Sequence, residues 1–335
     1  GTFHIEDIQD QVELALMRSG EHDVARAYVL YREERARLRA QQKAAQTEPK
    51  PQPISVIEGG VSRPLDLAKL QTLVQESCEG LGRAAEPEVI LRAVVKDLYD
   101  GVPMDEVRRC AVLSARALIE KDPAYSYVTA RLLLHTLRLE TLGVEVAQAE
   151  MNARYAEYLP QFIKQGIEAE LLDERLGNYD LKCLGAALDA NRDLKFTYLG
   201  LQILYDRYFL HVGGRRIELP QIFYMRVAMG LALNEPQDQR EARAIEFYNV
   251  LSSFDFMSST PTLFNSGTRR SQLASCYLTT VADDLDGIYE AIKENAMLQK
   301  YAGGIGNDWT PVRALGSHIK GTNGKSQGVV PFLKV

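Results

Sequence analysis

The sequence predicts a mainly α-helical chain whose last part changes character. Apolar residues recur at helical spacing through most of the first 250 residues, and Pro87, Pro103 and Pro123 stand where the first turns of helices are expected. From residue 251, Ser, Thr, Gly and Pro become frequent around a short strand-like run, Ala274–Thr279. A chain of 335 residues predicts two or three domains, at ~100–200 residues each.

Composition excludes several classes of protein. The chain has 39 basic and 45 acidic residues, a net charge of -6, which argues against binding along a nucleic-acid polymer. The most apolar stretch, Gln221–Asn234, is interrupted by Arg226 and is shorter than the ~18 residues of a membrane span. The first residues lack the pattern of a signal peptide. We therefore expect a cytoplasmic protein without a membrane segment.

The four cysteines have no CxxC spacing, which excludes a short-spaced zinc site and fits a reducing compartment. Cys78, Cys110 and Cys183 accompany apolar helix stripes and are predicted to be inert core thiols. Cys276 differs because it follows Ser275 in the strand-like run. From spacing alone, an inert role is still the favoured interpretation of Cys276, because most buried thiols are unreactive.

The helical pattern divides the chain into segments. Two short helices within 1–40 precede a Pro-rich linker, 41–53. A strand, turn and second strand follow over residues 55–63, and then helices at about 65–81, 87–99, 103–120 and 123–141. Ala25–Arg32 resembles Ala130–Leu137, so the first two helices look like the tail of a module whose complete copy is 54–142.

Residues 143–250 are again predicted to be helical, with a hairpin-like turn at Gly213-Gly214. Aromatic residues are dense in this segment, at a helical spacing typical of a core: Tyr155, Tyr158, Phe162, Tyr198, Tyr205, Tyr208 and Phe209. In the final segment, 251–335, the acids at 283, 284 and 286 suit the N-terminus of a helix over 286–301. Gly303–Gly306 are expected to end that helix, before a Gly-rich loop that runs to Gly328.

Two nucleotide-binding motifs fail on spacing, and no metal site is apparent. Gly321–Ser326 resembles a phosphate loop, but Ile319 stands where the Walker pattern needs its first Gly. Gly304–Gly306 begins a dinucleotide fingerprint, but Trp309 stands where the last Gly belongs. The five histidines have no ligand spacing, so no metal ligands are predicted.

Several segments nevertheless resemble one family, the large (alpha) subunit of class I ribonucleotide reductase. Ser259-Thr-Pro-Thr-Leu-Phe-Asn-Ser-Gly267 looks like its substrate-phosphate loop. Leu273-Ala-Ser-Cys-Tyr-Leu278 looks like the strand of its first redox cysteine, and Asp283–Ile288 like the effector-site acids that follow. Ala302–Gly306 and Val312–Gly321 look like its next helix end and its effector loop. The resemblance implies that 143–250 is the helical domain of that family and that 251–335 is the start of its ten-stranded α/β barrel.

The resemblance implies a chemistry and a set of site residues. The family reduces the 2′-hydroxyl of ribonucleoside diphosphates by cysteine radical chemistry, and Cys276 matches one member of its reducing cysteine pair. The positions that match substrate-binding residues are Thr260, Ser275 and Gly304. The positions that match the allosteric effector site are Asp283, Asp284, Leu285, Arg313 and Lys320. Lys320 stands where the family often has Arg, so it keeps the charge but loses the bidentate fork.

The N-terminal modules resemble the ATP-cone, a nucleotide-binding switch of such reductases. Residues 1–40 look like the C-terminal part of a first cone, and 54–142 like a second, degenerate one. Ile57–Gly60 replaces the usual basic hairpin, while Met104 and Leu139 stand where a hydroxyl residue and a Lys are common. Lys69 remains. Because a triphosphate needs cations, we expect the second cone to be structural and not to bind ATP; micromolar ATP binding by residues 54–142 would contradict this.

The same resemblance implies the partners of the chain. No covalently bound cofactor is expected. ATP, dATP and other deoxynucleotides are expected to bind with Mg as effectors, and a metal-containing small subunit is expected to supply the radical. A homodimer, with higher oligomers on inhibition, and thioredoxin or glutaredoxin as reductant are also implied. Since the sequence starts without Met and stops in mid-element, we expect a fragment that is inactive alone. Two alternatives stay open: a non-enzymatic nucleotide-sensing or oligomerisation module, and an adenosylcobalamin-dependent reductase of the same family.

Overall fold

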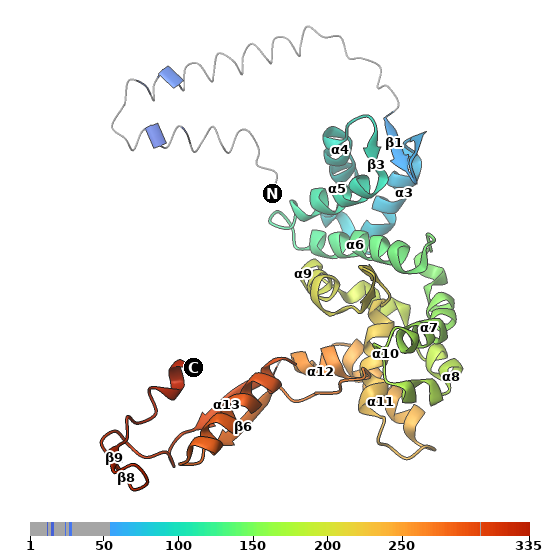
Figure 1. Ribbon diagram of the computed structural model, residues 1–335. Helices are drawn as coiled ribbons and strands as arrows, with labels where there is room; N and C mark the ends of the chain where they lie inside the picture. The colour runs from blue at the N-terminus through green and yellow to red at the C-terminus, as the bar shows by residue number, and fades with distance from the viewer. Residues whose placement is uncertain (1–11, 13–14, 17–23, 25–26, 29–53, 302) are drawn as a thin grey trace. The chain divides into compact units, whose positions relative to one another are not determined.

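The computed structural model describes residues 54–301 and 303–335, together with residues 12, 15–16, 24 and 27–28 (Figure 1). The predicted helices within 1–40 and the linker therefore fall almost entirely outside the described residues. The chain divides into two compact units, residues 1–65 with 99–103, and residues 66–98 with 104–335. Each unit is described by itself.

The described part of the first unit is a three-stranded sheet in the order β2-β1-β3. β1 (Ser55–Glu58) and β2 (Val61–Pro64) form an antiparallel hairpin, as predicted, and its turn glycines, Gly59 and Gly60, have positive φ angles of 58° and 81°. β3 (Val102–Pro103) runs parallel to β1 and was not predicted. Pro103 was expected in the first turn of a helix; it instead ends this strand.

The second unit begins with four helices, which confirms that prediction. They are α3 (Leu67–Cys78), α4 (Pro87–Asp97), α5 (Met104–Arg116) and α6 (Ala124–Leu142). Pro87 occupies the first turn of α4 and Pro123 the N-cap of α6, while Gly143, at a φ of 75°, ends α6 in the left-handed conformation. The apolar stripes face one another, so Val74, Ile90, Val94, Val107 and Leu137 are fully buried.

A second helical group follows in the same unit. It contains α7 (Met151–Glu168), α8 (Leu181–Ala186), α9 (Tyr198–Ile203), a π-helical turn η5 (Leu204–Tyr208), α10 (Pro220–Leu231) and α11 (Arg240–Ser252). The predicted hairpin is present as β4 (His211–Val212) and β5 (Arg215–Arg216). Almost every residue of α10 is buried, so this helix is the centre of the group.

The aromatic residues expected in the core divide into two sets. Tyr155, Tyr158, Phe162 and Phe209 are buried, as predicted. Tyr198, Tyr205 and Tyr208 are only half-buried, so their assignment to the core was wrong; Tyr198 on α9 and Tyr205 on η5 line a cavity. The sequence pattern could not separate these sets, since both have helical spacing.

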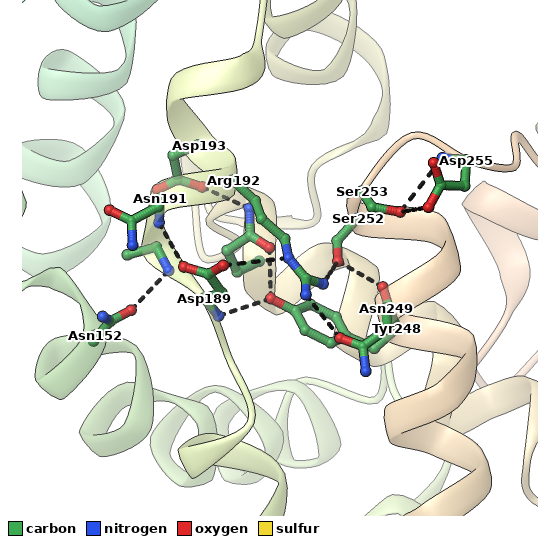
Figure 2. A network of polar contacts seen from close by, with 12 residues as sticks. Asn152, Asp189, Asn191, Arg192, Asp193, Tyr248, Asn249, Ser252, Ser253 and Asp255 are labelled. Carbon is green, nitrogen blue, oxygen red and sulfur yellow. Dashed lines mark hydrogen bonds and ion pairs between the residues drawn. The ribbon is translucent and has the colours of Figure 1, made fainter.

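A buried polar network joins α6 to this second helical group. The Asp193 carboxylate, which is 2% exposed, accepts hydrogen bonds from the Arg138 guanidinium of α6 at 2.8 Å and from the Tyr155 hydroxyl at 2.8 Å. Figure 2 shows the neighbouring Arg192, which donates to the Ser252 hydroxyl at 2.5 Å and the Asn249 side chain at 2.8 Å. These hydrogen bonds fix the 3₁₀ turn Ala190–Lys195 (η4) between α6 and α11.

The last segment contains a β–α–β unit. α12 (Thr260–Asn265) precedes β6 (Cys276–Thr280), α13 (Leu285–Gln299) and β7 (Gly304–Asp308), followed by the small hairpin β8 (His318–Ile319) and β9 (Gly324–Lys325). β6 and β7 are parallel neighbours, which requires a crossover such as α13. The predicted loop at residues 304–308 was therefore wrong. β7 was not predicted because it contains Gly304 and Gly306, and glycine is uncommon inside strands.

None of the described helices is both long and apolar enough to cross a membrane. In the last segment, a small core of Val281, Ile288, Ala291 and Val312 holds α13 against the strands.

Candidate functional site

The register of β6 and β7 brings three predicted site residues together. Cys276 is the first residue of β6 and pairs with Gly304, the first residue of β7. The Gly304 N–H donates to the carbonyl oxygen of Ser275 at 2.6 Å. A Cβ at Gly304 would lie 3.1 Å from that same carbonyl oxygen, so the absence of a side chain lets the two strand ends approach closely.

Cys276 is exposed and its Sγ lies 3.6 Å from the Ser275 hydroxyl. The other thiols differ from it in surroundings. Cys78 is buried, which raises the pKa of its thiol to about 11, and burial also raises the pKa of the half-buried Cys110. Both stay protonated near neutral pH, in agreement with the prediction of inert core thiols. Cys183, however, is exposed, so its assignment to the core was wrong.

Thr260 lies at the first position of α12, where its hydroxyl is 3.2 Å from that of Tyr208. The Tyr208 ring also stacks on Phe264 of α12, with ring centroids 4.3 Å apart. The opposite side of α12 is tied to the chain that enters β6, because the Thr262 hydroxyl donates to the Leu273 carbonyl at 2.9 Å. These contacts connect the Thr260 segment to the Cys276 strand.

A buried ion pair that the sequence analysis missed fixes the end of α12. The Arg226 guanidinium of α10 lies 2.6 Å from the Glu218 carboxylate, and both side chains are 0% exposed. Arg226 also donates to the carbonyl oxygens of Ser266 at 2.7 Å and Leu263 at 3.2 Å. We call Arg226 and Glu218 the α12 clamp. Its signal was present in the sequence, since a lone Arg inside the most apolar stretch of a chain needs a buried acceptor.

The residues predicted for an effector site are only partly assembled. The Arg313 Nε lies 2.9 Å from Oδ2 of Asp283, and the Arg313 N–H donates to Oδ1 at 2.9 Å. These hydrogen bonds hold the pKa of Asp283 below its usual range. Asp284 caps α13 by accepting from the Gly287 N–H at 2.8 Å, as its position before the helix predicted.

Leu285 and Lys320, also predicted for that site, make fewer contacts. Leu285 is the first residue of α13 and is 64% exposed. Lys320 follows β8 and is exposed, with no hydrogen bond or ion pair to Asp283 or Arg313 among the described residues. Within the same described part of the chain, no cluster of three or more His, Cys, Asp or Glu side chains could hold a metal ion.

Three family models match consecutive parts of the chain. They are an ATP cone domain over residues 1–37, the all-alpha domain of ribonucleotide reductase over 194–271, and the barrel domain of ribonucleotide reductase over 274–335. The chain belongs to the ribonucleotide reductase large-subunit family. On the structure of this family member, the barrel match begins two residues before Cys276, and the all-alpha match includes α10, α11, α12 and the α12 clamp.

Individual relatives agree with the family models. The chain is 47% identical over 337 residues to the ribonucleoside-diphosphate reductase subunit alpha of Chlamydia pneumoniae, covering 99% of this chain and 32% of the relative. It is 35% identical to the Helicobacter pylori (strain 26695) subunit alpha, over 84% of this chain and 35% of the relative. It is 37% identical to the large subunit of Danio rerio, over 80% of this chain and 33% of the relative. The chain thus spans about a third of the length of these reductases.

Proposed function

We propose that this chain supplies one reducing cysteine, the substrate loop and the effector site of a ribonucleoside-diphosphate reductase. The observation that carries the proposal is the exposed Cys276 thiol at the start of β6, directly beside Ser275 and opposite Gly304. Family membership supplies the reaction class. The product is a deoxyribonucleotide for DNA synthesis.

In the proposed reaction, the 2′-hydroxyl of the substrate leaves as water and two thiols become a disulfide. This transfers two electrons and two protons to the ribose–water pair, so a hydroxyl side chain could not replace Cys276. We assign one thiol to Cys276 and the second to the part of the relatives that this chain does not span. Cys276 is exposed, and its partner in the sheet, Gly304, has no side chain. A ribose could therefore approach the Cys276 sulfur.

We assign substrate binding to Thr260, Ser275 and Gly304. The hydroxyl groups of Thr260 and Ser275 can donate hydrogen bonds to a phosphate or ribose. Gly304 has no side chain, so its backbone can approach the ligand closely. The α12 clamp and the Tyr208 stack are proposed to keep Thr260 in place, since both contact α12 directly.

We assign the effector site to Asp283, Asp284, Leu285, Arg313 and Lys320. Arg313 uses Nε for the Asp283 carboxylate and Nη2 for the Asp283 carbonyl oxygen at 3.4 Å. A guanidinium has five N–H donors, so Arg313 can keep Asp283 and still offer Nη1 to an effector phosphate. The exposed Lys320 would add a second, single-point cation.

Homodimerisation through α13 is part of the proposal. Leu285, Tyr289 and Met297 on this helix are 64%, 52% and 57% exposed, which is unusual for large apolar side chains that share one helix. Packing α13 against its copy would cover them and place the effector residues at the interface. The proposed partners also include a radical-generating small subunit and a thioredoxin-type reductant in the cytoplasm, while residues 54–142 remain a proposed second ATP-cone that does not bind ATP.

The test is Cys276→Ser in a full-length large subunit that contains this chain, with thioredoxin as reductant. The proposal expects loss of at least 10³-fold in kcat because no disulfide can form, at roughly 1.4 kcal/mol of barrier per tenfold. Cys183→Ser, also an exposed thiol, is the matched control and should retain full turnover. Substantial turnover by Cys276→Ser would sink the proposal.

A further inference from the structure

A cavity of about 970 Å³ lies between α5 and α6 on one side and α9 with η5 on the other. α6, green in Figure 1, packs against both the teal α5 and the yellow α9. None of the residues that we assign to substrate or effector binding lines the cavity. Its volume is at the upper end of the ~300–1,000 Å³ that small-molecule sites have, so it can hold a ligand of nucleotide size.

Two arginines of α5 give this cavity a positive wall. Arg109 and Arg116 are seven residues apart, or two helical turns, and so lie on the same helix face. Both are exposed, and neither is paired with a carboxylate in the described part of the chain. The Arg116 guanidinium lies over the Tyr198 ring, 5.6 Å from its centre.

The acids that line the cavity are already engaged. Asp105 lies 2.7 Å from Arg108, and Glu140 lies 3.2 Å from Arg216. Asp206 accepts a hydrogen bond at 2.8 Å from a neighbouring glutamine. The lining therefore offers two arginines that are not paired with a carboxylate among the described residues, while Asp206, bonded to a neutral amide, is the lining carboxylate that keeps its full charge.

The remaining wall of the cavity is apolar and exposed, so a planar ring could pack against it. Leu113 of α5 and Leu199 of α9 are 48% and 68% exposed where they line the cavity, and Tyr198 adds an aromatic ring. A planar ring placed against these side chains would remove apolar surface from water. Aromatic stacking on Tyr198 would orient it.

We propose that this cavity binds a nucleotide, with its phosphates on Arg109 and Arg116 and its base against Leu113, Leu199 and Tyr198. An arginine guanidinium can bind two phosphate oxygens at once, so these two side chains favour a phosphorylated ligand over a neutral one. The bound nucleotide would contact α5 and α9 together and tie the proposed second cone to the helical group. The inference goes beyond the proposed function and does not depend on catalysis, because binding is measured on the 335-residue chain itself. The cavity also needs α9 and η5 and is not lined by Lys69, so residues 54–142 by themselves are still not expected to bind ATP.

The experiment is titration calorimetry of this chain with ATP, dATP and inorganic tripolyphosphate, together with hydrogen exchange. Saturable binding is expected, with protection of residues 109–116 and 198–206. In a parent chain that carries Arg313→Ala and Lys320→Ala to remove binding at the proposed effector site, Arg109→Ala with Arg116→Ala should weaken all three probes at least tenfold, whereas Tyr198→Ala should weaken the nucleotides and spare tripolyphosphate. Arg92→Ala with Arg243→Ala removes the same charge from exposed positions of α4 and α11, and should change nothing.

Three results would overturn the inference. They are no saturable binding of any probe at millimolar concentration, unchanged affinity and protection in the α5 double variant, and loss of binding in Lys69→Ala with the cavity residues intact. The last would place the nucleotide inside the proposed cone instead. If circular dichroism shows that the double variant is unfolded, Arg109→Gln alone, at an exposed position, must still weaken binding at least threefold.

Discussion

Removing one member of the α12 clamp should loosen α12 selectively. In Arg226→Met, the Glu218 carboxylate stays buried with a single remaining donor, the Leu210 N–H at 2.8 Å. The carbonyl oxygens of Ser266 and Leu263 lose their guanidinium donors as well. The Phe264 carbonyl oxygen, at 3.5 Å, loses the same donor, so the variant leaves a buried charge and three backbone acceptors without their partner.

The expected cost follows from this geometry. Truncating one side of a buried ion pair typically costs about 3–5 kcal/mol. That is a large share of the roughly 5–15 kcal/mol that stabilises an ordinary domain. At about 1.4 kcal/mol per tenfold, amides of residues 260–268 should exchange roughly a hundred to a few thousand times faster, unless global unfolding becomes the faster route.

The assay is hydrogen exchange with peptide-level mass spectrometry, paired with urea unfolding of the same variants. Glu218→Met with Arg226→Met should cost less than Arg226→Met alone, because the double variant leaves no buried charge. Arg243→Ala breaks an exposed pair with Glu246 and is expected to leave both readouts unchanged. If Arg226→Met exchanges like the parent at 260–268 and unfolds at the same urea concentration, the clamp has no role in holding α12.

Two further predictions concern packing and pH. Gly230→Ala would place a Cβ 2.1 Å from the Gly267 nitrogen, and such overpacking should lower the free energy of unfolding in urea by about 1–3 kcal/mol. Gly200→Ala, whose Cβ would have its nearest atom at 3.7 Å, should be neutral or stabilising. Equal effects of the two substitutions would refute the close contact at α10. Burial lowers the pKa of His135 from 6.5, so the unfolded chain binds its proton first and stability should fall as pH drops below 6.5. His135→Gln should lose less Tm between pH 7.5 and 5.5 than the parent; an identical loss would contradict the assignment.

Helical periodicity predicted the elements that local pattern controls. The hairpin at 55–63, the four helices after it and the cap of α13 by Asp284 depend on turn residues, proline positions and apolar stripes, which are local. β3 and β7 were missed because each exists through pairing with a strand distant in sequence, and β7 begins at a glycine. Cys183 was placed in the core because its leucine neighbours are buried, although its own side chain points to solvent.

The candidate site was predictable to a similar extent. The resemblance placed Cys276, Ser275 and Gly304 in one site, and the parallel register brings these three positions together. It also placed Asp283 and Arg313 in one site, and the two form an ion pair. The α12 clamp required the tertiary structure, since nothing in the sequence pairs Arg226 with Glu218 and with carbonyl oxygens 37 to 40 residues further along.

The central claim is that Cys276 is oxidised during turnover, and one measurement tests it directly. A full-length reductase containing this chain is given substrate, effector and small subunit for a single turnover without external reductant, then alkylated and mapped by mass spectrometry. The account predicts one deoxynucleotide per active site and a disulfide that includes Cys276, with Cys183 alkylated as a free thiol. Product formed while Cys276 remains fully alkylated would contradict the account.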